Sequence, residues 1–463
     1  MSLIIVVLAL VLLMYVAYRG FSVILFAPVC ALLAVLLTDP SLVLPMFSGV
    51  FLDKMVGFIK SYFPVFMLGA VFGKVIELSG FSKSIVSAVI KLVGRERTML
   101  SIVLVCSLLT YGGVSLFVVV FAVYPFAAEM FRQGDIPKRL IPGTIALGAF
   151  TFTMDALPGT PQIQNIIPTT FFKTDGWAAP WMGLIGSIFI FILGMAYLEW
   201  RRRKASKAGE GYGTNLVNEP EPFSQENLPN PWIAVSPLII VGVMNKVFTM
   251  LIPRFYGTAH TAQLPGMAKP LVTQVSSVVA IWAVEGALLL GILTVVVFAF
   301  KQIKERFADG SKSAIAGALL SVTNTASEYG FGGVIAALPG FLTVAEGLKA
   351  IPGVLINEAV SVSALAGITG SASGGMSIAL ATMANDFIAG AQAANIPLDV
   401  LHRIASMSSG GMDTLPHNGA VITLLAVTGL THKDSYIDIF SITLIKFAAV
   451  FVGIGVYYLT GVY

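Results

Sequence analysis

Charge is scarce in this chain of 463 residues. Asp, Glu, Lys and Arg make up 11% of it, whereas about 25% is usual in soluble domains. Hydrophobic residues reach 56% and the mean hydropathy is +0.87. A fold this poor in charge cannot cover itself with a water-compatible surface, so most of its surface must face lipid. The composition therefore excludes a soluble protein and predicts an integral membrane protein.

Cysteine is also scarce, and common catalytic motifs are missing. Cys30 and Cys106 both lie in apolar runs, which excludes a disulfide framework and a cysteine metal site. The net charge of +4 argues against a nucleic-acid partner. The sequence has no Walker A lysine loop, dinucleotide glycine motif or His-Glu-x-x-His helix. We therefore expect no cofactor, no metal and no enzymatic activity.

Several apolar runs approach the length of about 20 residues that a helix needs to cross a bilayer. The first charge is Arg19, after the first run, so we expect that run to be a span with the N-terminus outside, not a signal peptide. The polar segment 201–231 begins with four basic residues and is expected to be a flexible cytoplasmic linker. The expected spans are 3–18, 21–37, 62–78, 180–200, 233–252, 271–300, 313–338 and 437–460.

Two further apolar regions are interrupted by glycines. Residues 98–131 are broken at Tyr111-Gly112-Gly113, and residues 354–392 are broken between Gly370 and Gly375. Basic residues flank both ends of the first region only, so it is expected to be a re-entrant hairpin open to the cytoplasm, and the second a hairpin open to the outside. Non-helical backbone at membrane depth survives only beside protein or a water-filled cavity. Both tips are therefore candidate walls of a site.

Three short motifs recur in the same order in the two halves of the chain. The distance from Ser115 to Asp155 is 40 residues, and that from Ser377 to Asp413 is 36. Paired broken helices in inverted repeats are typical of secondary transporters, although duplication also builds channels and kinked helices can be architectural. The matching segments are 112–116 with 374–378, 135–137 with 395–397, and 154–158 with 412–416.

These patterns predict an all-α polytopic membrane protein made of two inverted repeats. The first repeat covers residues 1–200, with the hairpin 98–131 and a broken helix 140–172. The second covers residues 232–463, with the hairpin 354–392 and a broken helix 399–431. The segment 201–231 joins them.

Polar residues gather at the hairpin tips and at the breaks of the helices. Pro158, Pro161 and Pro416 must unwind their helices, and the freed backbone groups need side chains or a ligand as partners. This cluster contains no Arg or Lys, so we expect helix N-termini and hydroxyls to hold an anion; tight helix contacts are the alternative use of the glycines. The expected substrate-binding residues are Tyr111, Gly112, Gly113, Ser115, Thr153, Thr160, Gln162, Ser371, Ser373, Gly374, Gly375, Thr414, His417 and Asn418.

Two acids occupy matching places in the halves. Asp155 and Asp413 lie in segments that read as membrane spans, where an ionised acid is costly unless it is paired, hydrated or protonated. Capping of the second half-helix is the alternative role. His417 follows Asp413 by four residues and ordinarily titrates near neutral pH. We expect Asp155, Asp413 and His417 to handle the coupling ion, mainly at Asp413. Weaker candidates are Asn324, Thr325 and Glu328.

With these hairpins and breaks the chain resembles the ion transporter superfamily, and it is similar to the gluconate permease (GntP) family over nearly its full length. Segments 155–161 and 413–419 lie where that family has unwound helices. Gluconate members carry different, histidine-containing segments there, and this chain looks more like the hydroxybutyrate permease branch. The resemblance implies proton-coupled symport of a small hydroxy monocarboxylate, such as 3-hydroxybutyrate, lactate or gluconate. It also implies an elevator mechanism and a homodimer, in the inner membrane of a bacterium.

Other functions use the same residues. A sodium-coupled organic anion symporter or a cation/proton antiporter would use the two acids. A membrane-embedded serine hydrolase would use the segment 371–374 with His417 as base, but that reading leaves the internal repeat unexplained.

Overall fold

The computed structural model describes residues 2–19, 21–94, 97–114, 116–214, 217–220, 228–341, 343, 347, 351–416 and 418–463. Helices make up nearly all of the secondary structure, so the expectation of an all-α polytopic membrane protein is confirmed. Among the described residues, five helices are long and apolar enough to cross a membrane. They cover Pro40–Leu78, Pro180–Lys207, Pro231–Tyr256, Val279–Ile303 and His432–Thr460.

One group of eight described helices packs together around the long helices α4 and α14. Within it, α4 packs along both α14 and α13, and α14 also packs against α2. Long helices from the two halves of the chain therefore pack against each other. The group consists of α1 (Ser2–Tyr18), α2 (Val23–Thr38), α3 (Val43–Met46), α4 (Leu52–Leu78), α5 (Phe81–Val93), α12 (Pro231–Tyr256), α13 (Val279–Ile303) and α14 (Phe307–Ala337).

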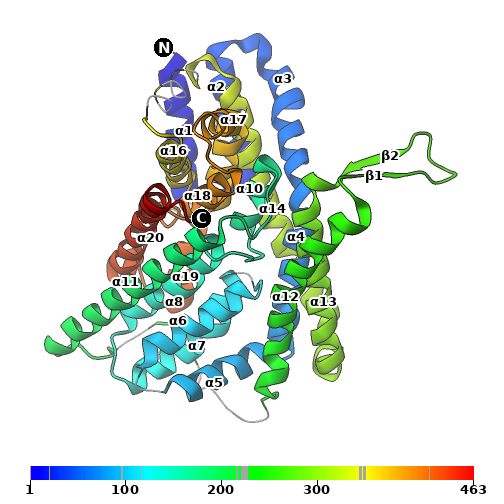
Figure 1. Ribbon diagram of the computed structural model, residues 1–463. Coiled ribbons are helices and arrows are strands. Elements are labelled where there is room, and N and C mark those ends of the chain that lie inside the picture. Colours follow the sequence, from blue (N-terminus) through cyan, green and yellow to red (C-terminus); the bar gives the residue numbers. More distant parts are fainter. Residues whose placement is uncertain are drawn as a thin grey trace.

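The second group holds two helical hairpins and two interrupted helices. The hairpin α6–α7 lies in the lower half of the molecule and the hairpin α16–α17 in the upper half (Figure 1). The helix α10 packs against α17, and its counterpart α19 packs against α7. The group consists of α6 (Thr98–Tyr111), α7 (Leu116–Gln133), α8 (Ile141–Ala149), α9 (Phe152–Asp155), α10 (Ile163–Phe172), α11 (Pro180–Lys207), α16 (Val354–Thr369), α17 (Ala372–Ala393), α18 (Leu398–Ser409), α19 (Gly419–Thr428) and α20 (His432–Thr460).

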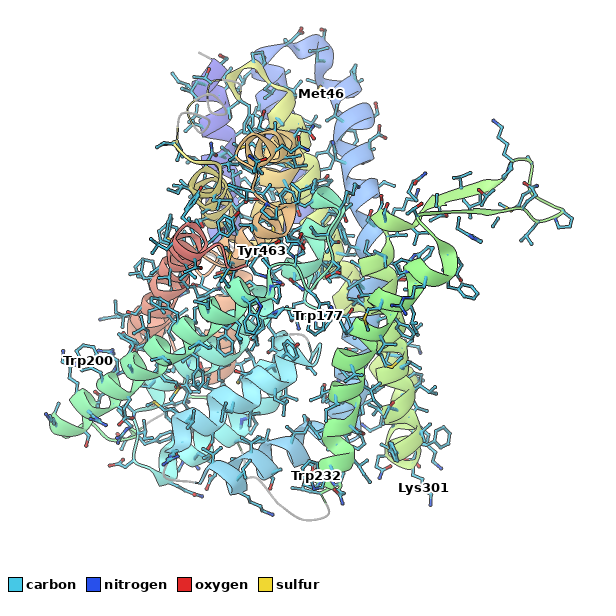
Figure 2. The ribbon with its side chains drawn as sticks, in the orientation of Figure 1. Met46, Trp177, Trp200, Trp232, Lys301 and Tyr463 are labelled. Carbon is cyan, nitrogen blue, oxygen red and sulfur yellow. The ribbon has the colours of Figure 1, made fainter. Side chains whose placement is uncertain are left out.

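The two ends of the fold differ in charge. Trp200, next to the basic end of α11, and Lys301, at the end of α13, both lie in the lower half of the molecule, away from Met46 at the top (Figure 2). The hairpin α6–α7 lies in that same half (Figure 1). Basic residues mark the cytoplasmic side of membrane proteins, so the lower end in these views is the one that the sequence predicts to face the cytoplasm.

One expected span begins later than predicted. Residues 271–300 were expected to form a continuous helix, but β2 (Leu271–Gln274) pairs antiparallel with β1 (Ala259–Ala262), and α13 starts at Val279. The ribbon formed by β1 and β2 projects from the top of α12 and α13 (Figure 1). The apolar residues of β2, including Val272, are exposed. Hydropathy alone did not separate this exposed strand from the span that follows it.

The described part of the linker is anchored, so the expectation of a flexible segment is wrong there. Glu219 accepts a salt bridge from Lys138 at 2.7 Å, and Glu210 accepts one from Arg139 at 2.6 Å. The side-chain amide of Asn218 donates to the carbonyl of Ala426 at 2.9 Å. These contacts attach the linker to the segment between α7 and α8 and to the end of α19.

Candidate functional site

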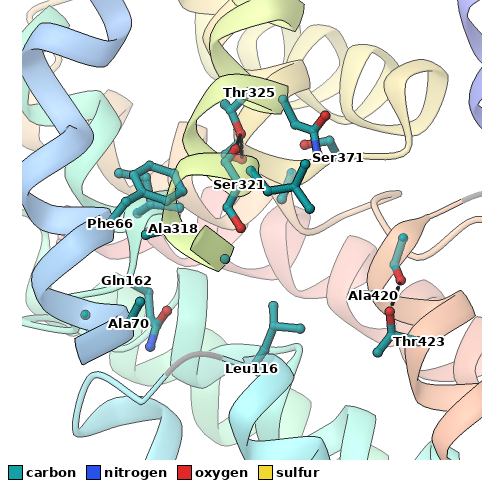
Figure 3. Close-up of a pocket in the computed structure, with 18 of the residues that line it drawn as sticks. Phe66, Ala70, Leu116, Gln162, Ala318, Ser321, Thr325, Ser371, Ala420 and Thr423 are labelled. Carbon is teal, nitrogen blue, oxygen red and sulfur yellow. Dashed lines mark hydrogen bonds between the residues drawn. The ribbon is translucent and has the colours of Figure 1, made fainter. Parts of the chain in front are cut away.

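A cavity of about 1030 Å³ lies where both hairpin tips and both helix breaks meet. Figure 3 shows Ser321 and Thr325 of α14 on the same side as Ser371, with Gln162 and Leu116 across from them. Its polar wall combines hydroxyls, amides and carboxyls from both halves of the chain. The polar lining residues are Lys74, Glu77, Gln162, Gln164, Ser313, Ser321, Asn324, Thr325, Glu328, Ser371, Ser373, Asp413, Thr414, Asn418 and Thr423.

Four helices begin at this cavity. The first residues of α7, α10, α17 and α19 are Leu116, Ile163, Ala372 and Gly419, and all four line the wall. The first N–H groups of a helix have no partner within the helix, and its N-terminus carries a partial positive charge. Four such ends around one space favour a bound anion.

The hairpin tips are held by the residues that start the second half of each broken helix. Gln162 precedes α10, and its side-chain amide donates to the carbonyl of Thr110 at 2.7 Å. Asn418 precedes α19, and its side-chain amide donates to the carbonyl of Gly370 at 2.7 Å. The side-chain oxygen of Asn418 also caps α19 by accepting from the N–H of Val421 at 2.9 Å. Each break is thus tied to the tip of the hairpin in its own half of the chain.

Lys446 joins the two acids that the sequence singled out. Its Nζ lies 3.3 Å from Oδ2 of Asp155 and 3.3 Å from Oδ1 of Asp413, and it donates to the carbonyl of Phe150 at 2.6 Å. All three charged side chains are buried. A Cβ on Gly410 would overlap with both Lys446 and Asp155, so glycine is required for this approach. The expectation of a site without Arg or Lys is therefore wrong.

Arg403 organises the first break. Its guanidinium donates to the carbonyl of Ala178 at 2.8 Å and to the side-chain oxygen of Asn165 at 3.0 Å. The amide of Asn165 donates in turn to the carbonyls of Thr160 and Gly176, both at 2.9 Å. Arg403 is fully buried, and its principal carbonyl partners belong to the loop that connects α10 to α11. It therefore supplies donors to buried carbonyls of a loop that lies beside the first break.

The helix α14 forms the part of the wall beside the start of α17. Thr325 on α14 lies 3.4 Å from Ser373 on α17, hydroxyl to hydroxyl. Glu328, one turn further along α14, is 6% exposed and lines the cavity. The three residues that the sequence gave lower priority on this helix, Asn324, Thr325 and Glu328, all face the cavity.

The structure separates the expected site residues into two sets. Asp413 and several expected ligands line the cavity, whereas Asp155 lies behind it. Ser115 and His417 lie outside the described residues. The expected residues on the wall are Gly113, Gln162, Ser371, Ser373, Thr414 and Asn418.

The remaining expected ligands have structural contacts. The hydroxyl of Tyr111 donates to the carbonyl of Pro158 at 3.0 Å, and a Cβ on Gly112 would overlap with Leu238 of α12. Thr160 donates to the carbonyl of Thr153 at 2.8 Å. A Cβ on Gly375 would overlap with the backbone of α16. Two more expected residues, Thr153 and Gly374, do not contribute to the wall either: Thr153 donates to the carbonyl of Gly148, and Gly374 lies against Glu328.

Sequence reasoning missed Lys446 and Arg403. Lys446 is the single charged residue of segment 439–463, an apolar run that was expected to cross the membrane. A charge within such a run marks a functional residue by default. Arg403 on α18 lacks this signal, because His402 precedes it directly and Asp399 lies four residues before it.

Comparison with known proteins identifies relatives of the whole chain. No family model matches it. YxjC of Bacillus subtilis (strain 168), an uncharacterized transporter, is 59% identical over an alignment of 470 residues that covers 100% of both proteins.

Two solved structures share the fold. The YdaH transporter of Alcanivorax borkumensis, described as having an unusual topology, matches 92% of this chain and 90% of its own with a TM-score of 0.56 and 14% identity. MtrF of Neisseria gonorrhoeae, from a class of antimetabolite efflux pumps, matches 88% of this chain and 83% of its own with a TM-score of 0.51 and 13% identity. At such identities the likeness concerns the fold alone.

Proposed function

This chain belongs to the same family as the transporter YxjC, and we propose that it is a secondary active transporter that moves a small organic anion together with protons. The observation that carries the proposal is the meeting of four helix N-termini at one cavity of about 1030 Å³. Such ends attract negative charge. The cavity is built from paired breaks in the two halves of the chain, an arrangement typical of secondary transporters.

The wall favours a substrate with one carboxylate and further hydroxyls. Serine, threonine, asparagine and glutamine side chains supply donors and acceptors for hydroxyl groups, as on Ser321 and Asn324. Three carboxyl groups, those of Glu77, Glu328 and Asp413, also line the wall and would repel a second or third substrate carboxylate. We therefore infer a hydroxy monocarboxylate such as 3-hydroxybutyrate, lactate or gluconate. The resemblance of the chain to the hydroxybutyrate permease branch supports the same class.

We place coupling at the acids near Lys446. Asp413 both contacts Lys446 and lines the cavity, so it can exchange a proton with the space that the substrate enters. Asp155 contacts Lys446 from behind the wall, where it stabilises the first break. His417 stays a proposed modulator of Asp413. A sodium-coupled symporter and a cation/proton antiporter are the alternatives, because both would use the same acids.

The proposed movement is that of an elevator. The paired contacts of α10 with α17 and of α19 with α7 support two inverted repeats, residues 1–200 and 232–463, whose hairpins and broken helices form one moving unit. The helices α11 and α20 pack against each other, and α20 also packs against α8 and α18. We therefore assign α11 and α20 to the moving unit. The interlocked helices α2, α4, α13 and α14 would form the fixed part, in each subunit of a homodimer.

Transport by the purified protein in liposomes tests the function. An inward proton gradient is expected to drive accumulation of labelled 3-hydroxybutyrate, with lactate and gluconate competing better than succinate or citrate. Accumulation driven by a sodium gradient at equal pH would instead support sodium coupling. Proton release on addition of sodium alone, with no anion present, would support an antiporter.

A further inference from the structure

Glu328 is the acid of the cavity that has no cationic partner among the residues that the structure describes. It lies on α14 and its side chain reaches the start of α17, where a Cβ on Gly374 would overlap with its Oε2. Ser371 is hydrogen-bonded to the Glu328 carboxyl. Oε2 of Glu328 is buried and accepts no hydrogen bond from the residues that the structure describes.

The start of α17 has the features of an anion site. Ser371 caps the helix by accepting from the N–H of Gly374 at 3.1 Å, and the helix that follows is 22 residues long. Its first N–H groups and partial positive charge lie at the cavity wall. The carboxyl group of Glu328, nine-tenths buried and aimed at this end, occupies the place that an anion would take.

No described cation neutralises Glu328. Lys54 of α4 lies over the ring of Tyr329, and Lys74 of α4 pairs with Glu77 at 2.9 Å. Lys446 pairs with the two aspartates. The elements packed against α14 are α2, α4, α17 and the π-helical turn Phe47–Phe51. Their other titratable side chains are Cys30 on α2, Asp53, Lys60 and Tyr62 on α4, and Asp386 on α17, with Asp309 and Lys312 on α14 itself.

We propose that Glu328 competes with the substrate for the N-terminus of α17. The Glu328 carboxylate occupies this helix end while it is charged. When Glu328 binds a proton, the substrate carboxylate takes its place. This inference rests on the proposed function and assigns a residue to the binding step. Two carboxylates cannot share one helix end without mutual repulsion. A protonated Glu328 carries no charge and offers a hydroxyl donor instead. Each bound anion therefore brings one proton with it.

Proton-linked binding has a measurable slope. If one proton must bind for each anion, affinity falls about tenfold for each unit of pH above the transition of the acid. Glutamine keeps the shape of Glu328 but is never charged. In Glu328→Gln, therefore, the α17 N-terminus is open to the anion at every pH, and affinity is expected to be independent of pH between 6 and 10.

Calorimetric titration of the purified full-length protein with 3-hydroxybutyrate, lactate and gluconate in unit steps from pH 6 to pH 10, in sodium-free buffer, tests the inference. The wild type is expected to lose about tenfold in affinity per pH unit once the pH exceeds the transition of the Glu328 carboxyl, and Glu328→Gln is expected to show a flat profile. Glu285→Gln, an acid of α13 away from the cavity, is the matched control and should keep the wild-type slope. Glu328→Ala, with the same flat profile expected, serves if the glutamine variant does not fold.

The outcomes separate the two proposals. Retention of the wild-type slope in Glu328→Gln or Glu328→Ala would overturn the role of Glu328 and leave the transport of anions intact. Wild-type affinity that is flat with pH but rises with sodium would overturn it as well. Absence of binding of all three anions to the wild type at every pH would overturn the proposed function and this inference together.

Discussion

Nζ of Lys446 lies 3.3 Å from Oδ1 of Asp413, so the last helix of the chain is ionically joined to the second helix break. The same ammonium group reaches Asp155 at the first break. One residue of α20 thereby connects the two halves of the chain beside the cavity. Any change at Lys446 must affect both breaks.

Replacement of Lys446 by methionine is expected to destabilise the protein strongly. The change leaves two buried acids without their cation, and breaking a buried ion pair typically costs about 3–5 kcal/mol. Thermal unfolding in detergent should show a lowered Tm, and transport should be lost. Lys433→Met, at the exposed first turn of the same helix, is the control and should leave both unchanged. An unchanged Tm in Lys446→Met would contradict the ion pairs described here.

Asp413→Asn is expected to lower the accumulation driven by a pH gradient, because the proton proposed at Glu328 would still accompany the anion, while exchange of anions across the membrane continues. Asp413 is the acid of the pair that lines the cavity, and exchange requires no net movement of protons. Asp155→Asn should still accumulate substrate, because the acid at the wall remains. Both rates are measured in liposomes, with and without an imposed gradient. Undiminished accumulation by Asp413→Asn would place coupling elsewhere.

A bridge between α14 and α17 is expected to stop transport if α17 moves against α14. The hydroxyls of Thr325 and Ser373 lie 3.4 Å apart, so cysteines at both positions should be joined by mercury or by oxidation. Transport by the double variant should fall to background after cross-linking and return on reduction. The two single-cysteine variants provide the control. Full transport after complete cross-linking would exclude relative movement at this contact.

The anchoring of the linker is expected to depend on pH. The Arg139 guanidinium, through its hydrogen bonds to Glu210, holds the pKa of that carboxyl below its usual value of 4.5. A lowered pKa stabilises the anchored state above the usual value, and this contribution is lost as the pH falls through the lowered value. A spin label at Ala208 should therefore gain mobility as the pH falls below 4.5. Glu210→Gln should give the mobile spectrum already at pH 7; equal spectra for both proteins at pH 7 would contradict this.

Local interruptions of the helices were predictable from the sequence, whereas long-range partners were not. Gly113 and Pro161 interrupt their helices by their own backbone properties, and both line the cavity. Lys446 is 291 residues from Asp155 along the chain, and only the packing of α20 beside both breaks brings them together. A lone charge in an apolar run marks a residue as unusual but does not name its partner.

The linker shows the same limit. Its polar composition indicated a segment outside the membrane, and composition alone favoured flexibility. The anchoring pairs, such as Glu219 with Lys138, join residues from separate parts of the chain. Their existence depends on where the end of α7 meets the end of α19, which no local pattern encodes.

The strand ribbon of β1 and β2 is an exposed feature on one side of the molecule. It extends from α12 and α13, away from both hairpins (Figure 1), and side chains such as His260 and Leu264 on and between its strands are exposed to solvent. A fluorophore or an antibody fragment attached there would mark the position of the part of the molecule that is proposed to stay fixed during transport. The distance from this probe to a second probe on α17 could then be measured during turnover. A change in that distance would give the displacement of the substrate-binding unit relative to the fixed part.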